Sequence, residues 1–82
     1  MKIVWDEAKR IANIAKHGLD FGDLTDEFFM SAVTVPARNG RYKAIGRLSD
    51  GTIAAIFVTL GSEAVSVISV RPARKDERSL IE

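Results

Sequence analysis

The feature that most constrains this fold is an apolar segment, residues 65–70, that runs directly into a proline and a group of basic residues. Its β-branched and short polar side chains favour a pleated, largely covered strand over a helix. Pro72 cannot donate a ladder hydrogen bond, but proline is well tolerated in the first turn of a helix. The sequence therefore predicts a buried strand that ends near Arg71 and a short helix that begins at about Ala73.

The predicted C-terminal helix is basic and carries Arg74, Lys75 and Arg78. Arg74 and Arg78 are four residues apart, so they share a helix face on which like charges repel slightly. Such a face indicates an anionic partner, although a solvated surface helix would carry the same charges.

Three strands are predicted over residues 41–48, 52–60 and 63–71, joined by tight turns at 49–51 and 61–62. Residues 52–60 are nearly all apolar, which is typical of a central strand. Side chains alternate between the faces of a strand. One face of the first strand is then largely basic and holds Arg41, Lys43, Ile45 and Arg47. On the last strand, Val65, Val67, Ser69 and Arg71 are expected to share a face.

In the N-terminal half, the sequence pattern predicts an edge strand at residues 3–5 and a helix over 7–17. Asp6 is expected to cap this helix and Gly18 to end it. The residues at helical spacing that should face the core are Ala8, Ile11, Ala12, Ala15 and, beyond the helix end, Leu19, with Lys9, Asn13 and either Lys16 or His17 outside. A second helix is predicted over 21–30 and a short strand over 31–35. An Asn-Gly turn follows at 37–40. The pattern predicts an α+β fold: two N-terminal helices packed on a mainly antiparallel sheet of four to five strands, with a short C-terminal helix.

Composition limits the function. With 82 residues and no break in composition, the chain is expected to be a single domain over residues 1–82. It has no cysteine and a single histidine, so no metal site or cofactor is expected. No segment reads as a membrane span or a signal peptide, which favours a cytoplasmic protein. Residues 36–82 hold eight Lys/Arg against five Asp/Glu, whereas residues 1–35 hold four against six.

The basic side chains of the C-terminal half are the main candidate for chemistry, because arginine forks match phosphate geometry. A solvated sheet face with charged edges is the competing interpretation. His17 could carry a proton or simply end its helix, where the helix dipole favours an imidazolium. Glu77, three residues after Arg74, could hold that guanidinium, act as a base, or form an ordinary surface ion pair.

Three blocks of residues resemble a known family. The first is Trp5-Asp6, Lys9, Asn13, Lys16-His17-Gly18 and Phe21; the second is Tyr42 to Gly51 with Ile45-Gly46-Arg47; the third is Ile68-Ser69-Val70-Arg71, Ala73-Arg74 and Glu77-Arg78. Together they resemble the BrnT-type toxins of bacterial type II toxin–antitoxin systems. The resemblance implies a RelE/ParE-like fold, RNA cleavage that arrests translation, and a ribbon-helix-helix (BrnA-like) antitoxin. Operator DNA would be bound only through that antitoxin.

On this resemblance, the leading hypothesis is a metal-independent endoribonuclease that acts on RNA, with participation of the ribosome left open. The catalytic candidates are His17, Arg71, Arg74 and Glu77. The RNA-binding candidates are Lys9, Lys16, Arg41, Lys43, Arg47, Lys75 and Arg78. Pro72 replaces a basic residue of the family and Ile81 a tyrosine, which favours the alternative of a non-catalytic module for antitoxin binding and DNA-linked autoregulation. A toxin directed at gyrase is a third hypothesis.

Overall fold

The computed structural model describes residues 1–49 and 51–82. The described strands are β1 (Lys2–Trp5), β2 (Val33–Pro36), β3 (Tyr42–Leu48), β4 (Gly51–Leu60) and β5 (Ala64–Pro72). The described α-helices are α1 (Glu7–His17), α2 (Asp26–Ser31) and α3 (Lys75–Arg78), and the 3₁₀ turns are η1 (Phe21–Asp23) and η2 (Arg38–Gly40). The predicted turn at residues 49–51 includes Asp50, which lies outside the described residues.

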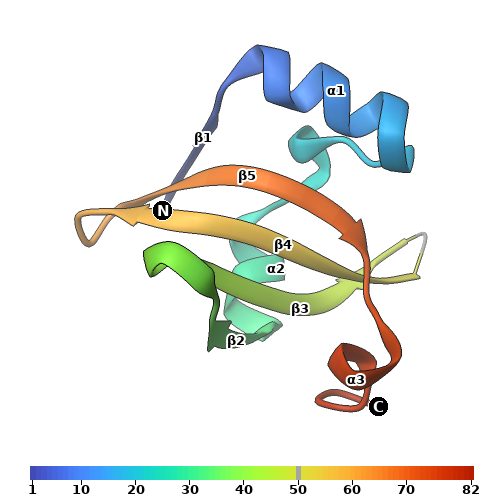
Figure 1. Cartoon of the computed structure of the whole chain (residues 1–82). Helices are drawn as coiled ribbons and strands as arrows, with labels where there is room; N and C mark the ends of the chain where they lie inside the picture. Colours follow the sequence, from blue (N-terminus) through green and yellow to red (C-terminus); the bar gives the residue numbers. More distant parts are fainter. Residues whose placement is uncertain (50) are drawn as a thin grey trace.

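The strands form one mixed sheet in the order β1-β5-β4-β3-β2 (Figure 1). β1 runs parallel to β5, and the other neighbouring pairs are antiparallel. The α+β class and the mainly antiparallel sheet are thus confirmed. β1 is an edge strand, as its sequence predicts, and β4 lies at the centre with β5 and β3 on either side.

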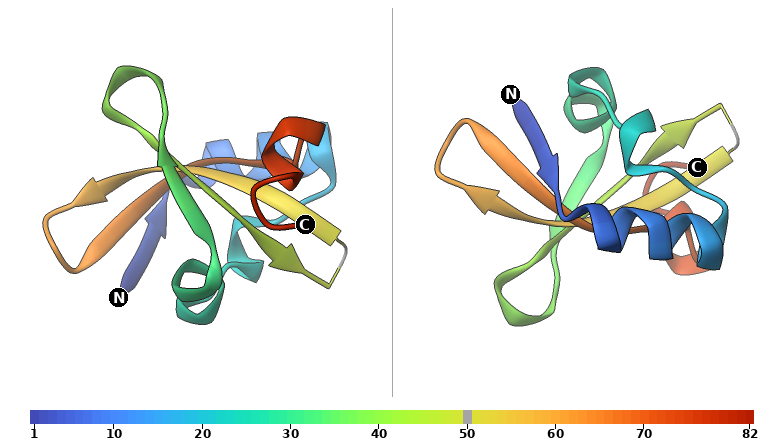
Figure 2. Two further views of the ribbon diagram at one scale, coloured as in Figure 1. Left: turned by 90° about the horizontal axis from the view of Figure 1, so that it is seen from below. Right: turned by 90° about the horizontal axis from the view of Figure 1, so that it is seen from above.

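One face of the sheet is covered by η1 and α2, with α1 along the β5 side (Figure 2). Phe21 and Phe28 are buried there against the inward side chains of the strands. The buried core residues are Leu19, Phe21, Leu24, Phe28, Ala44, Ile53, Ala55, Phe57, Val65, Val67 and Val70. None of the helices in the described ranges is long and apolar enough to cross a membrane.

The boundaries of α1 are as predicted, but its inward face is not. Asp6 accepts a hydrogen bond from Ala8 N at 2.9 Å, and Gly18 ends the helix with φ 70°. Ile11, predicted to face the core, is 58% exposed, whereas Asn13 is only 6% exposed. Since β1 pairs with β5 only as far as Val67, the edge of β5 beyond it needs hydrogen-bonding partners, and a polar side chain of α1 supplies them.

The prediction of one helix over residues 21–30 was wrong, because two capping residues start two shorter elements. Asp20 accepts a hydrogen bond from Gly22 N at 2.8 Å and begins η1. Thr25 then accepts from Phe28 N at 3.1 Å and begins α2. Each cap satisfies the free N–H groups of a new helix start, so the chain turns between them.

A β-bulge in the β4–β5 pair overturns the face predicted for β5. Phe57 is opposite Val67 whereas Ile56 is opposite Ser69, so Ile68 is the extra residue. A bulge of one residue shifts the side-chain alternation beyond it. Val65 and Val67 therefore point into the core, while Arg71 lies on the opposite, open face.

The junction after β5 also differs from the prediction. Pro72 is paired in register with Ile53, and Ala73 N donates to Thr52 O at 3.0 Å, so the strand extends past Arg71. The helix α3 begins at Lys75 rather than at Ala73. A proline is tolerated at a strand end where its missing N–H is not needed. The segment after β5 docks on the open face through a small buried cluster of Ile45, Ala54 and Ala73, against which Ile81 packs.

Candidate active site

The open face of the sheet carries a pocket of about 560 Å³, within the usual size range of small-molecule sites. Three segments form it: the β2–β3 turn together with the start of β3, the middle of β4, and the junction of β5 with α3. The residues that line it are Ala37, Arg38, Arg41, Lys43, Ile56, Arg71 and Arg74. In the view from below, the β2–β3 turn and α3 lie apart with strands of the sheet between them (Figure 2, left).

Glu77 is the buried centre of this basic site, with a side chain that is 2% exposed. Its carboxylate accepts hydrogen bonds from Arg71 Nη1 at 2.6 Å and from Arg71 Nη2 at 2.8 Å. The backbone N of Arg74 donates at 2.8 Å, and Lys43 Nζ lies 2.8 Å from Oε2. Both oxygens therefore receive two donors, and a residue of α3 fixes cations from β5 and β3.

These contacts determine the charge of Glu77. The hydrogen bonds from Arg71 hold the pKa of the Glu77 carboxyl far below its usual range, and those from Arg74 N and Lys43 lower it further, against the opposing effect of burial. The same pair raises the pKa of Arg71. Glu77 is thus ionised and fully occupied as an acceptor at neutral pH. Of the roles considered for it, the geometry favours holding a guanidinium, although the guanidinium is that of Arg71 rather than Arg74.

The remaining cations of the pocket are differently placed. Among the described residues, no carboxylate oxygen lies within 4.0 Å of the side-chain nitrogens of Arg38, Arg41 or Arg74. Burying or clustering unpaired cations is unfavourable, so such a group attracts anions. The sequence does not single out Arg38, because the Asn-Gly pair indicates only a turn over residues 37–40. The available signal was a pair of arginines on either side of that Asn-Gly.

Several predicted residues lie outside the pocket. His17, Lys9 and Lys16 all belong to α1, on the outer edge of β5, and none of them lines the pocket. Arg47 is exposed near the end of β3. The exposed side chains of Lys75 and Arg78 are on α3, where Arg78 Nη1 donates to Ala73 O at 3.1 Å. The structure therefore brings Arg41, Lys43, Arg71, Arg74 and Glu77 together and leaves the other candidates apart.

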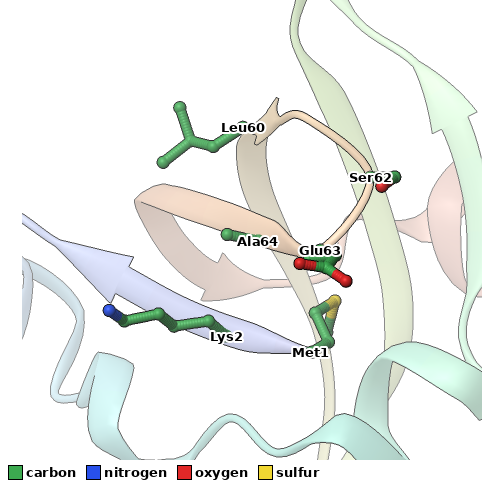
Figure 3. Close-up of a pocket in the computed structure, with 6 residues that line it drawn as sticks. All are labelled: Met1, Lys2, Leu60, Ser62, Glu63 and Ala64. Carbon is green, nitrogen blue, oxygen red and sulfur yellow. The ribbon is translucent and has the colours of Figure 1, made fainter.

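A second hollow, of about 670 Å³, lies at the β4–β5 turn beside the start of β1 (Figure 3). It is lined by Met1, Lys2, Leu60, Ser62, Glu63 and Ala64. It contains one basic and one acidic side chain, so no charge of one sign converges there. Across residues 1–49 and 51–82, no cluster of three or more His, Cys, Asp or Glu is placed to hold a metal ion.

Comparison with known proteins gives the family. A family model described as "Ribonuclease toxin, BrnT, of type II toxin-antitoxin system" matches residues 5–77, a range that includes every residue of the basic pocket. The 1.1 Å crystal structure of the Brucella abortus ribonuclease toxin BrnT is similar, with a TM-score of 0.83 and 56% sequence identity. That match covers 92% of this chain and 99% of the other. No curated protein matches the chain. Because the family model spans most of the sequence and the structural relative agrees with it, the chain belongs to the BrnT family of ribonuclease toxins of type II toxin–antitoxin systems.

Proposed function

We propose that this toxin cleaves RNA in the basic pocket, without a metal ion, by attack of a ribose 2′-hydroxyl on the adjacent phosphorus. The observation that carries the proposal is the convergence on one hollow of five cationic side chains from two chain segments, residues 38–43 and 71–74. The family match favours this ribonuclease over a non-catalytic binding module. Ile81 packs against the cluster of Ile45, Ala54 and Ala73 and does not line the pocket.

In the proposed reaction, the 2′-oxygen bonds to phosphorus and the bond from phosphorus to the 5′-oxygen breaks. The products are a 2′,3′-cyclic phosphate and a 5′-hydroxyl, whose oxygen takes a proton from water as it leaves phosphorus. Negative charge increases on the phosphoryl oxygens in the transition state. Arg71, held by Glu77, supplies a preorganised donor to that charge, and the guanidinium of Arg74 at the start of α3 supplies a second donor. Removing one such donor typically costs about 10² to 10³ in rate.

The described lining of the pocket provides no side chain suited to accept the proton of the 2′-hydroxyl. The described residues that line the pocket carry Arg, Lys, Ala and Ile side chains, and none of these is a base near neutral pH. Glu77 is occupied by four donors, and His17 is on α1 outside the pocket. We therefore assign the proton of the 2′-hydroxyl to hydroxide or water, or to a group of the ribosome. Positioning and charge stabilisation are the contributions of this chain.

The proposal extends to partners and context. The type II family implies an antitoxin, and we propose that it is a ribbon-helix-helix (BrnA-like) protein through which operator DNA is bound. We further propose that residues 1–82 act as one toxin domain with a RelE/ParE-like arrangement, in the cytoplasm, where RNA cleavage stops translation. Production of the toxin alone should then arrest bacterial growth, and co-production of the antitoxin should restore it.

The decisive experiment uses purified protein and an end-labelled single-stranded RNA. Cleavage should persist in excess EDTA and leave 2′,3′-cyclic phosphate ends, and an RNA with 2′-O-methyl groups throughout should resist. Cleavage that requires added Mg²⁺, or that proceeds on the 2′-O-methyl RNA, would overturn the mechanism. Growth arrest without any RNA cleavage would instead point to another target such as gyrase.

A further inference from the structure

The basic pocket has two walls with different electrostatics. On the α3 side, Arg71 and the floor residue Lys43 share the carboxylate of Glu77. On the opposite side, the β2–β3 turn contributes Arg38 and Arg41, which have no carboxylate partner among the residues that the structure describes. The charge of one wall is thus balanced in part by Glu77, whereas the other wall has two guanidinium groups with no ion-pair partner in residues 1–49 and 51–82.

The turn that carries these arginines is a defined structure. Ala37 N donates to Arg41 O at 2.8 Å, and Arg41 N donates to Arg38 O at 3.1 Å. Between them, Asn39 and Gly40 have φ of 59° and 72°, the left-handed conformation that Asn and Gly adopt most readily. Two backbone hydrogen bonds and this turn chemistry fix the backbone from which the two arginines extend on one side of the pocket. Rigidly held charge gives a more specific site than charge on a mobile loop.

Among the described residues, no aromatic side chain on which a base could stack lines the floor between the walls. Ile56 lies there, half-buried, opposite Lys43. The nearest aromatic residue along the chain, Tyr42, stacks on Phe57 with ring centroids 5.9 Å apart and does not line the pocket. Single-stranded RNA is usually read through bases stacked on aromatic rings. This pocket instead offers guanidinium forks, whose preferred partner is phosphate.

We propose that the β2–β3 turn is a second phosphate subsite, in which Arg38 and Arg41 bind the phosphate next to the one being cleaved. The inference rests on the proposed function, since it takes Arg71 and Arg74 as the site of the scissile phosphate. The toxin then grips two consecutive phosphates of a single strand across the pocket. Its substrate class is an RNA strand with at least two phosphodiesters, recognised through the backbone with little dependence on base identity.

The test is the salt dependence of binding to an eight-nucleotide 2′-O-methyl RNA, which cannot be cleaved by 2′-hydroxyl attack. For single strands, each phosphate contact contributes about 0.7 to the slope of log Kd against log salt. The double variant R38A/R41A should lose about 0.7 of slope. Its affinity at moderate salt should fall about tenfold, on the scale of one lost charge-assisted contact. R38K/R41K, which keeps both charges, should retain the slope.

Lys2→Ala is the control for simple loss of positive charge, because Lys2 lies at the second hollow at the start of β1. Its slope should match the wild type, and circular dichroism should show that every variant is folded. A slope for R38A/R41A equal to that of Lys2→Ala would overturn the subsite. RNA cleavage by the wild type is measured separately with unmodified RNA. A wild type that binds with the expected slopes but does not cleave would refute the proposed function and leave Arg38 and Arg41 as a phosphate-binding site only.

Discussion

Asn13 completes the hydrogen bonding of Val70 in both directions: its Nδ2 donates to Val70 O at 2.8 Å, and its Oδ1 accepts from Val70 N at 3.1 Å. Nδ2 also donates to Leu19 O at 2.9 Å. A side-chain amide on α1 thus takes the place of a neighbouring strand where β1 has ended. Because Val70 directly precedes Arg71, this contact fixes the segment that delivers Arg71 to the pocket.

Asn13→Ala should therefore lower the free energy of unfolding more than a typical substitution on a helix does. It leaves the N–H and C=O of buried Val70 without their partner, and each unsatisfied buried group costs about 1 to 3 kcal/mol. We expect a loss of about 3 kcal/mol in the free energy of unfolding, measured by urea denaturation. Lys9→Ala, on the exposed side of the same helix, should change it by about 0.5 kcal/mol or less. Equal effects of the two variants would mean that the amide contributes nothing to stability.

The position of Asn13 also shows which property of α1 could not be predicted from the sequence. The helix and its caps could be predicted, because Asp6 and Gly18 act through local hydrogen bonds and backbone conformation. Its inward face could not, because apolar spacing favoured Ile11. The side that packs was decided by an unpaired strand edge, which depends on how far β1 extends along β5. That is a tertiary property with no local signal.

Glu77 should make stability depend on pH in the acid range. Its pKa is lowered in the folded state, so its contribution is fully present above the unfolded value, about 4.3, and is lost as the pH falls. Wild-type stability should then decrease from about pH 5 downward, whereas Glu77→Gln should be less stable at pH 7 and flatter in acid. Breaking a buried ion pair costs about 3 kcal/mol or more at neutral pH. Parallel pH profiles for the two proteins, from thermal or urea unfolding, would contradict this.

The same substitution should separate binding from catalysis. Glu77→Gln removes a negative charge beneath the pocket, so RNA should bind at least as well as to the wild type, with an unchanged or lower KM. Arg71 loses the bidentate partner that orients it, and misplacement of a reacting group costs about 10²-fold. We expect kcat to fall by about that factor. Single-turnover cleavage at saturating RNA measures it, and a rise in KM with unchanged kcat would assign Glu77 to binding.

Arg74 gives the cleaner test of charge stabilisation. Its side chain has no ion-pair partner among the described residues, so Arg74→Ala should leave the fold intact and reduce RNA cleavage by about 10²-fold. Arg71→Ala should reduce cleavage as much but also lower stability, because it leaves buried Glu77 with fewer donors. The measurement is single-turnover cleavage with circular dichroism as the folding control. A loss of twofold or less for Arg74→Ala, no greater than for Lys2→Ala, would remove Arg74 from the catalytic assignment.

Charge and strand alternation predict much of the site. The rest of the site depends on the β-bulge in β5 and on the position of the β2–β3 turn. Lys43 was expected on a basic strand face, whereas Arg71 was expected to share the face of Val65, Val67 and Ser69. The bulge at Ile68 was not predicted from the sequence, and this bulge places Arg71 on the face opposite Val67. Arg38 was missed because its role depends on where the β2–β3 turn lies relative to β5. Sequence periodicity can assign residues to faces only while the ladder is regular.

Gly46 should tolerate no side chain, because β3 passes directly under α2 at that point. A Cβ added there would lie 2.8 Å from Phe28 Cε1 and 3.3 Å from Ala32 Cβ. Phe28 is 4% exposed and its ring is packed edge-on against Phe29, so it cannot move away freely. Overpacking of this kind costs about 1 to 3 kcal/mol, and Gly46→Ala should lose that much stability.

The rescue test for this contact is a double-mutant cycle. Phe28→Leu shortens the side chain that would clash with the new Cβ, so Gly46→Ala should cost less in the Phe28→Leu background than in the wild type. The coupling should be about 1 kcal/mol in urea unfolding. If the cost of Gly46→Ala is the same in both backgrounds, the clash with Phe28 is not its cause, and the backbone of β3 must need glycine for another reason.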